Sequence, residues 1–276
     1  MDSHQNKHLS CGKMLEDIRY EYYESVDSTN DRIKIRAKND EAEGLVISAG
    51  EQTAGKGRIG RRWQSPIGES ISTSILLKPD DIPLESVSTI TIIAAMAVRK
   101  ALEDTCGLSG LIKWPNDIVF DGKKICGILT EMEMKENRVW YLVCGIGVNV
   151  HNRDFTEDIS FKATSVDLEL EKLSNPNGDD TIKRGSCKKI TESIWENFKD
   201  YYNTFLKTGD LTNLREEYEK SLANKNERVR IEDPQGSYEA MARGIDDRGH
   251  LLVEIDGNIK EISTGEVSVR GVYGYV

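Results

Sequence analysis

Two short turn signals in the middle of the chain restrict its fold more than any other feature. Asp121-Gly122 separates apolar residues 118–120 from residues 125–132, and a polar turn at residues 135–137 precedes residues 139–148. Such short turns join antiparallel strands, because a parallel connection needs about a dozen residues or more. The sequence therefore predicts an α+β fold and argues against a doubly wound parallel sheet.

Further elements are predicted on both sides of this region. Three more segments have strand patterns: residues 20–26, 45–48 and 70–77. The last alternates polar and apolar residues, as a half-buried strand does. Helical spacing of apolar residues follows N-cap residues 28–31, starts again at Pro83, and recurs from Ile190 to Phe205 with Tyr201 on the apolar face. The polar residues 151–180 are predicted to form a mobile excursion.

The C-terminal part has a different pattern. From Glu227 onward, short apolar segments alternate with turn signals such as residues 233–236, 246–249 and 256–258. This pattern predicts a small β-barrel after the last helix. We place the boundary near residues 224–226, which gives domains of residues 1–225 and 226–276.

Composition excludes several classes of protein. The 47 acidic and 37 basic side chains give a net charge of −10, so we expect no binding to bulk nucleic acid. No apolar run approaches the roughly 18 residues of a membrane span, and no secretory signal is present, so we expect no membrane partner and a cytoplasmic protein. The five cysteines and four histidines lack the spacing of metal ligands, and we expect no metal site.

A loop rich in glycine and cations is the most informative chemical feature. Gly55, Gly57 and Gly60 satisfy the dinucleotide fingerprint, but residues 63–68 lead into a strand, whereas that fingerprint must open a helix. The loop carries four cations: Lys56, Arg58, Arg61 and Arg62. Arginine side chains and backbone amides both bind phosphate oxygens, so the loop suits a small polyanionic ligand. A solvated basic loop without function is the alternative.

Three further clusters are weak alone. Lys113-Trp114-Pro115-Asn116-Asp117 reads as a strand end that brings polar side chains to one rim. In Lys124-Ile125-Cys126-Gly127-Ile128-Leu129, a lysine precedes a strand whose glycine leaves room for something to lie against the backbone. Gly145-Ile146-Gly147-Val148-Asn149 is a strand end with two glycines and an amide.

With the triplet Ser28-Thr29-Asn30 and the C-terminal segment 265–270, these clusters closely resemble the biotin–protein ligases, in the family's order over residues 20–271. The resemblance implies a catalytic domain of mixed sheet and helices, related to class II tRNA synthetase cores, followed by an SH3-like barrel. Because only residues 1–19 precede the first predicted strand, we expect a monofunctional ligase without an N-terminal DNA-binding domain. Lys56 stands where the family usually has arginine, so the positive charge is kept but the bidentate geometry of a guanidinium is lost.

The resemblance implies a reaction in two steps. Biotin and ATP, with Mg²⁺, give biotinyl-5'-adenylate, and a lysine of a biotin carboxyl carrier domain of a carboxylase then attacks it. By the resemblance, the biotin site comprises Ser28, Thr29, Gln52, Gly55, Lys56, Arg58, Trp63, Lys124, Gly127, Leu129 and Gly145. The ATP site comprises Arg58, Arg61, Trp63, Lys113, Asn116, Asn149 and Arg270. The catalytic residues are Lys124, Asp117 and Arg58.

Several alternatives stay open at this point. Asp117 can deprotonate the incoming lysine or only hold it electrostatically, and the sequence does not distinguish the two. A lipoate–protein ligase would share the fold, a non-enzymatic biotin-binding regulator would bind without catalysis, and an SH3-type interaction protein would explain only residues 227–271. Exposed strand edges of such a sheet can also pair two copies into a homodimer.

Overall fold

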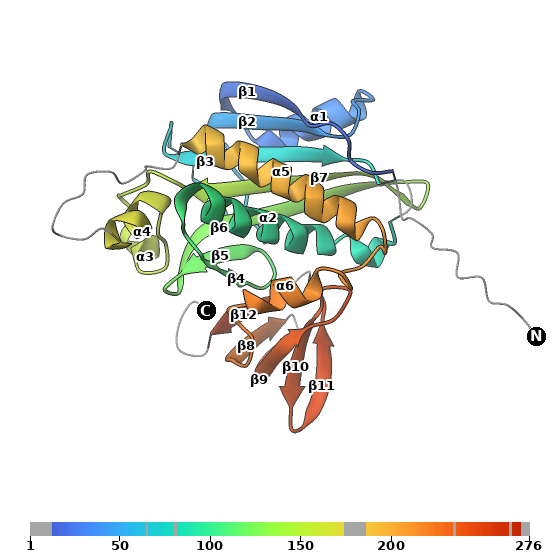
Figure 1. Ribbon diagram of the computed structural model, residues 1–276, viewed down its shortest axis with the longest axis vertical. Helices are drawn as coiled ribbons and strands as arrows, with labels where there is room; N and C mark the ends of the chain where they lie inside the picture. The colour runs from blue at the N-terminus through green and yellow to red at the C-terminus, as the bar shows by residue number, and fades with distance from the viewer. Residues whose placement is uncertain are drawn as a thin grey trace, which may run out of the picture.

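A computed structural model describes residues 13–64, 66–79, 82–173, 186–233, 236–264 and 267–271. They form a large mixed sheet with helices and a smaller C-terminal sheet (Figure 1). The first part contains β1 (Arg19–Val26), α1 (Thr29–Lys38), β2 (Leu45–Gln52), β3 (Ser70–Leu77), the 3₁₀ turn η1 (Leu84–Ser86), α2 (Thr89–Cys106), β4 (Leu111–Lys113), β5 (Asp117–Phe120), β6 (Lys123–Lys135), β7 (Arg138–Asn149), α3 (Glu157–Ser160), α4 (Val166–Leu173), α5 (Cys187–Phe205) and α6 (Arg215–Lys220). The second contains β8 (Arg228–Asp233), β9 (Gly236–Ile245), β10 (Leu251–Ile255), β11 (Asn258–Ile262) and β12 (Ser268–Gly271).

The large sheet has seven strands in the order β1-β2-β3-β7-β6-β5-β4. Strands β4, β5, β6 and β7 pair antiparallel with their neighbours, as the short turns predict. Strands β1 and β2 pair parallel, because α1 carries the chain back between them. The expected mixed sheet with helices is therefore confirmed.

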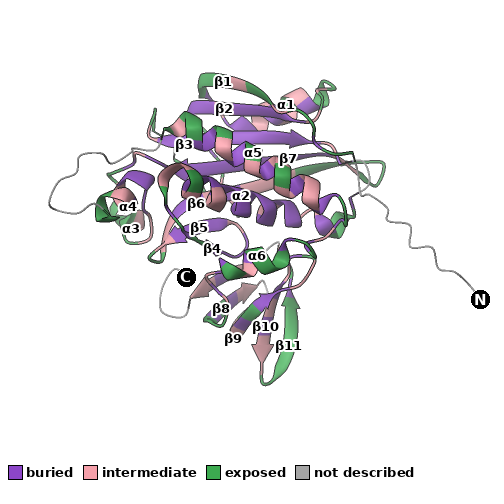
Figure 2. Cartoon of the chain, viewed as in Figure 1, coloured by how far each residue is buried: buried purple, intermediate pink, exposed green. Residues whose placement is uncertain are grey.

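Helices cover the two faces of this sheet unequally. In Figure 1, α2 and α5 lie across the same face, and their apolar residues belong to the main apolar core. On the other face, α1 packs through Ile33 and Ala37 against Ile47, Leu76 and Val143 in a smaller core. Both faces of β3 are thus covered, and all eight of its residues are buried (Figure 2). The expected half-buried strand was wrong, because Ser70, Thr73 and Ser74 find hydrogen-bond partners inside the protein and can therefore be buried.

The helical segments differ in detail from the sequence prediction. The chain after Pro83 first forms η1, and α2 begins only at Thr89 and ends at Gly107 in the left-handed conformation. In α5, Tyr202 is buried with the other core aromatic residues, whereas Tyr201 is only half-buried. Residues 151–173 do not form a loose excursion, because α4 packs with Val166 buried. The rest of the predicted excursion, residues 174–180, lies outside the described residues.

The C-terminal sheet has five antiparallel strands in the order β11-β10-β9-β8-β12. The predicted turns at residues 246–249 and 256–258, after β9 and β10, are confirmed. Residues 234–235 of the predicted turn at 233–236, and residues 265–266 of the C-terminal motif, lie outside the described residues. Within the described ranges, no helix is long and apolar enough to cross a membrane.

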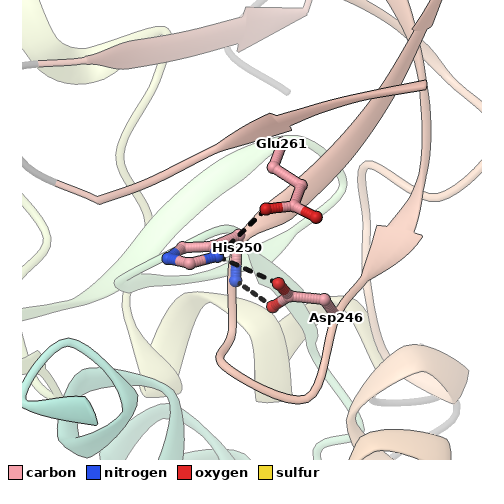
Figure 3. A group of neighbouring side chains, drawn as sticks. All are labelled: Asp246, His250 and Glu261. Atoms are coloured by element: carbon pink, nitrogen blue, oxygen red, sulfur yellow. Dashed lines mark hydrogen bonds and ion pairs between the residues drawn. The ribbon is translucent and has the colours of Figure 1, made fainter. Parts of the chain in front are cut away.

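The turn between β9 and β10 locks the two sheets together. Asp246 accepts hydrogen bonds from the backbone of Arg248 and His250, and its other oxygen lies 2.9 Å from His250 Nδ1 (Figure 3). Glu261, 65% exposed in its side chain, lies 3.9 Å from the same ring nitrogen. These contacts indicate that the cluster of Asp246, His250 and Glu261 stabilises a tight turn.

The braced turn presents its backbone to the catalytic sheet. The Trp114 indole donates a 2.9 Å hydrogen bond to the Gly249 carbonyl, and both Trp114 and this bond are buried. A Cβ at Gly249 would lie 2.5 Å from Ile92 of α2, and its φ of +80° favours glycine. The C-terminal sheet therefore has a fixed place beside the segment 113–117, next to the site described below.

Candidate active site

Three glycines make a hollow in the face of the large sheet opposite α2 and α5. Gly127 of β6 pairs directly with Gly147 of β7, and Gly145 lies two residues along β7 on the same face. A Cβ at Gly147 would lie 2.3 Å from the Trp63 ring, and one at Gly127 would lie 2.8 Å from Lys124 Nζ. The glycines thus let these side chains rest on the sheet backbone.

A cavity opens over this hollow, between α1 and the loop that follows β2. It contains about 470 Å³ of space not occupied by protein atoms, and this figure includes space open to solvent. Its lining includes the following residues from the predicted biotin set: Ser28, Thr29, Gln52, Lys56, Arg58, Trp63, Lys124, Gly127, Leu129 and Gly145. Far-separated motifs therefore meet at one cavity.

Gly55 differs from the other residues of that set. Gly55 is not among the described residues that line the cavity. Its carbonyl instead accepts the backbone N–H of Trp63, and a Cβ at Gly55 would lie 2.4 Å from the Trp63 carbonyl oxygen. Gly55 thus shapes the loop and places Trp63.

The polar end of the cavity begins at α1. Ser28 is the N-cap residue of α1 and is buried, yet within the described residues its hydroxyl makes no capping bond. Thr29 donates its backbone N–H to Gln52 Oε1 at 2.8 Å, and its hydroxyl lies 3.0 Å from the same oxygen. Lys56 forms a 2.7 Å ion pair with Asp31, so its charge is directed to α1.

A second cavity adjoins the first and is rich in cations. Arg58, Trp63, Asn116 and Lys124 line both cavities. The second also includes Arg61, Arg62, Lys113, Asp117 and, from β12, Arg270. A third cavity continues from Arg61, Trp63, Lys124 and Arg270 to Asn149, whose amide donates to the Thr164 carbonyl. The predicted ATP residues thus surround two adjoining spaces.

A hydrogen-bonded group of side chains joins the two main cavities. Lys124 Nζ lies 2.6 Å from Asp117 Oδ1, and the Asn116 amide donates to the same oxygen at 3.1 Å. Arg58 Nη1 donates to Asn116 Oδ1 at 2.9 Å. The group holds two cations and one carboxylate on the boundary between a polar pocket and a cationic one.

Burial changes the proton affinities here. Burial lowers the pKa of Lys113 to about 8, with nearby Arg270, Lys124 and Arg61 acting in the same direction and Asp117 opposing them. Burial also lowers the pKa of the Arg58 guanidinium, with Arg61 in the same direction. Crowded, partly desolvated cations of this kind favour a polyanionic ligand.

Three functional candidates were missed by the sequence analysis. Asn30 lies in a motif but received no role, and Ser74 and Glu131 lie in strands without a motif. A Cβ at Gly145 would lie 2.1 Å from Asn30 Oδ1, so the glycine at position 145 was the available signal for Asn30. Ser74 and Glu131 are brought to Asn30 only by strand pairing.

Comparison with known proteins places this geometry in a family. Residues 22–149 match the Biotin/lipoate A/B protein ligase family, and residues 226–270 match the Biotin protein ligase C terminal domain. The chain is 34% identical over 250 residues to the bifunctional ligase/repressor BirA of Bacillus subtilis (strain 168), covering 90% of this chain and 73% of that protein. This chain belongs to the biotin protein ligase family.

Other biotin protein ligases extend the match. The biotin--[acetyl-CoA-carboxylase] ligase of Mycobacterium tuberculosis (strain ATCC 25618 / H37Rv) is 29% identical over 247 residues, covering 87% of this chain and 85% of that protein. The structure of the Aquifex aeolicus biotin protein ligase with biotin and ATP superimposes with a TM-score of 0.75 and 26% identity, covering 91% of this chain and 98% of that one. The expected family and catalytic-plus-C-terminal architecture are confirmed.

Proposed function

We propose that this biotin protein ligase activates biotin with Mg²⁺–ATP as biotinyl-5'-adenylate and transfers biotin to a lysine of a carboxylase's carrier domain. One observation supports the joining of an acid to a nucleotide at this site. The polar cavity at Thr29 and the cation-rich cavity at Lys113 share Arg58, Asn116 and Lys124. An acid bound in one and a nucleoside triphosphate bound in the other would meet beside two cations.

The first cavity suits the ring system and chain of biotin. Thr29 and Gln52 present polar atoms at its α1 end, with Ser28 and Lys56 beside them. Trp63 lies over Gly127 and Gly147 as an apolar wall, continued by Leu129. A ligand with a small polar head and an apolar chain fits this distribution.

The second and third cavities suit the nucleotide. Arg61, Lys113 and Arg270 supply positive charge for phosphates, and Mg²⁺ would enter with ATP as part of the substrate. Asn116 and Asn149 offer amide oxygens on this side. Catalysis then rests on positioning and on offsetting negative charge, and it needs no nucleophile from the enzyme.

Asp117 faces the second step. It is ion-paired with Lys124 and hydrogen-bonded to Asn116. Lys124 and Asn116 fix this carboxylate in the lining of the cation-rich cavity, where it can attract the ammonium group of an incoming lysine. We therefore assign Asp117 the role of electrostatic anchor.

Transfer to an isolated carrier domain tests the proposal. The protein is incubated with biotin, Mg²⁺–ATP and the biotin carboxyl carrier domain, and intact mass shows whether one biotinyl group is added. Reactions without ATP, or with the acceptor lysine of the carrier replaced by arginine, should give no product. Failure of the complete reaction would overturn the proposal.

Lipoate is the competing acid. Residues 22–149 match a family model that covers both biotin and lipoate ligases. The match of residues 226–270 to a biotin protein ligase domain favours biotin. The same assay with lipoate and its carrier domain should therefore give no product.

Lys113 should make ATP binding depend on pH. Its pKa of about 8 means that it loses its charge above that pH, whereas bound phosphates would keep it protonated. Affinity should be constant from about pH 7, where the terminal phosphate is already ionised, and then fall by up to about tenfold per pH unit above pH 8. Calorimetric titration with ATP measures this fall, and Lys113→Met should remove it. An unchanged pH profile in that variant would contradict the assignment.

A further inference from the structure

A chain of polar side chains runs from the first cavity into the protein. The Thr29 hydroxyl lies 2.7 Å from the Ser74 hydroxyl, and Ser74 donates to Asn30 Oδ1 at 2.6 Å. The Asn30 amide donates to Glu131 Oε2 at 2.7 Å, and the other Glu131 oxygen accepts from Lys34 at 2.6 Å. Thr29 and Asn30 line the cavity, and the rest of the chain lies behind them.

The direction of these hydrogen bonds follows from the atoms involved. A carboxylate can only accept, so Glu131 fixes the Asn30 amide nitrogen on its side and turns the Asn30 oxygen toward Ser74. Ser74 must then spend its single proton on Asn30, and its oxygen is left to accept from Thr29.

The proton of the Thr29 hydroxyl is therefore donated inside the protein and not toward the cavity. Two acceptors compete for it, the Ser74 oxygen at 2.7 Å and Gln52 Oε1 at 3.0 Å. Gln52 Oε1 already accepts the backbone N–H of Thr29 at 2.8 Å, whereas the Ser74 oxygen has no other donor among the described residues. The Thr29 hydroxyl therefore donates to Ser74. Toward the cavity, the Thr29 hydroxyl can present only lone pairs.

The surroundings keep the chain in this state. Ser74 is fully buried and Asn30 is 4% exposed, so water does not substitute for a lost partner. The hollow at Gly145 holds the Asn30 carboxamide, because a Cβ there would lie 2.1 Å from its oxygen. The hydroxyl at Thr29 is thus oriented by Ser74, Asn30 and Glu131, of which Asn30 alone lines the cavity.

We propose that Ser74, Asn30 and Glu131 are positioning residues that fix Thr29 as a hydrogen-bond acceptor and so select an acid whose head group donates an N–H at this point. This inference rests on the proposed function, since the cyclic urea of biotin offers such an N–H. A head group with only acceptor atoms would face the lone pairs of Thr29 and lose affinity.

The test combines one variant with altered ligands. Binding of biotin is compared with binding of two analogues in which one or the other ring N–H is replaced by oxygen, using calorimetry on the full chain. The variant is Ser74→Ala, which removes the nearer acceptor of the Thr29 proton and leaves only Gln52 Oε1, which already accepts the Thr29 backbone N–H. The matched control is Ser48→Ala, which removes a contact of the same 2.7 Å length between the hydroxyls of Ser48 and Thr73. The Thr73 hydroxyl also accepts a hydrogen bond from Trp195 of α5.

The wild type and the control should bind one analogue at least about tenfold more weakly than biotin, the effect of one unpaired buried group. In Ser74→Ala that preference should fall to about threefold or less, because the Thr29 hydroxyl can then donate to the analogue's oxygen instead of to Gln52 Oε1. The kcat for adenylate formation should change by less than about twofold, while KM for biotin rises, since binding rather than chemistry is altered.

Each outcome has a separate meaning. A wild type that binds no biotin would overturn the proposed function itself. A wild type that binds biotin, together with a Ser74→Ala variant that keeps the full preference over both analogues, would overturn the positioning role alone. Equal loss of preference in Ser48→Ala would also overturn it, because a general disturbance of β3 would then explain the result.

Discussion

Replacing Lys124 with alanine is expected to slow biotin-dependent pyrophosphate exchange by at least about a hundredfold, the effect of one lost preorganised donor. Lys124 Nζ lies between the two cavities, 2.6 Å from Asp117 and 6.0 Å from the centre of the Trp63 ring. Its backbone is fixed by hydrogen bonds with residues 162 and 164. The cation is therefore placed to offset charge that develops between the acid and the phosphate.

The neighbouring lysine provides the control. Lys123 begins β6 one residue earlier and is not among the described residues that line these cavities. Lys123→Ala should keep the wild-type exchange rate while changing the net charge by the same amount. Exchange at the wild-type rate in Lys124→Ala would remove Lys124 from the catalytic group.

The sequence predicted the parts of the fold that local signals determine. Short turns at residues 121–122 and 135–137 specified antiparallel strands, and these are present. Local signals predicted the helix after residues 28–31, but they did not specify that β1 and β2, which it connects, pair in parallel. The burial of both faces of β3 likewise depends on α1 and α5, which are far apart in the sequence.

The candidate site likewise combines residues that local motifs predicted with residues that only the fold brings together. Motif residues such as Lys124 and Gly127 meet in one cavity, as the resemblance implies. The room at Gly127 is filled by Lys124 and Trp63 from the protein itself, which spacing along a strand could not reveal. Ser74 and Glu131 reach Asn30 because β3, β7 and β6 lie side by side in register. Contacts set by register across three strands have no counterpart in a single motif.

Replacing Arg58 with glycine is expected to release biotinyl-5'-adenylate into solution about ten- to a hundredfold faster, the effect of lost charge-assisted hydrogen bonds. Arg58 lines both cavities and donates to Asn116 Oδ1 at 2.9 Å, and its burial lowers its pKa. It is thus not a solvated loop charge. Arg61 and Lys124 remain to support synthesis, so adenylate should form and then escape.

Escaped adenylate would biotinylate bystander lysines without selectivity, because the mixed anhydride reacts with any exposed amine. The measurement is labelling of an unrelated protein beside the carrier domain, with adenylate in the filtrate quantified separately. Arg58→Ala should behave like Arg58→Gly if the lost guanidinium is responsible, whereas added loop flexibility would affect only the glycine variant. Arg58→Lys should restore part of the retention, since a point charge remains but the forked geometry is lost. Retained adenylate and labelling of the carrier alone in Arg58→Gly would show that other groups hold the intermediate until the carrier lysine arrives.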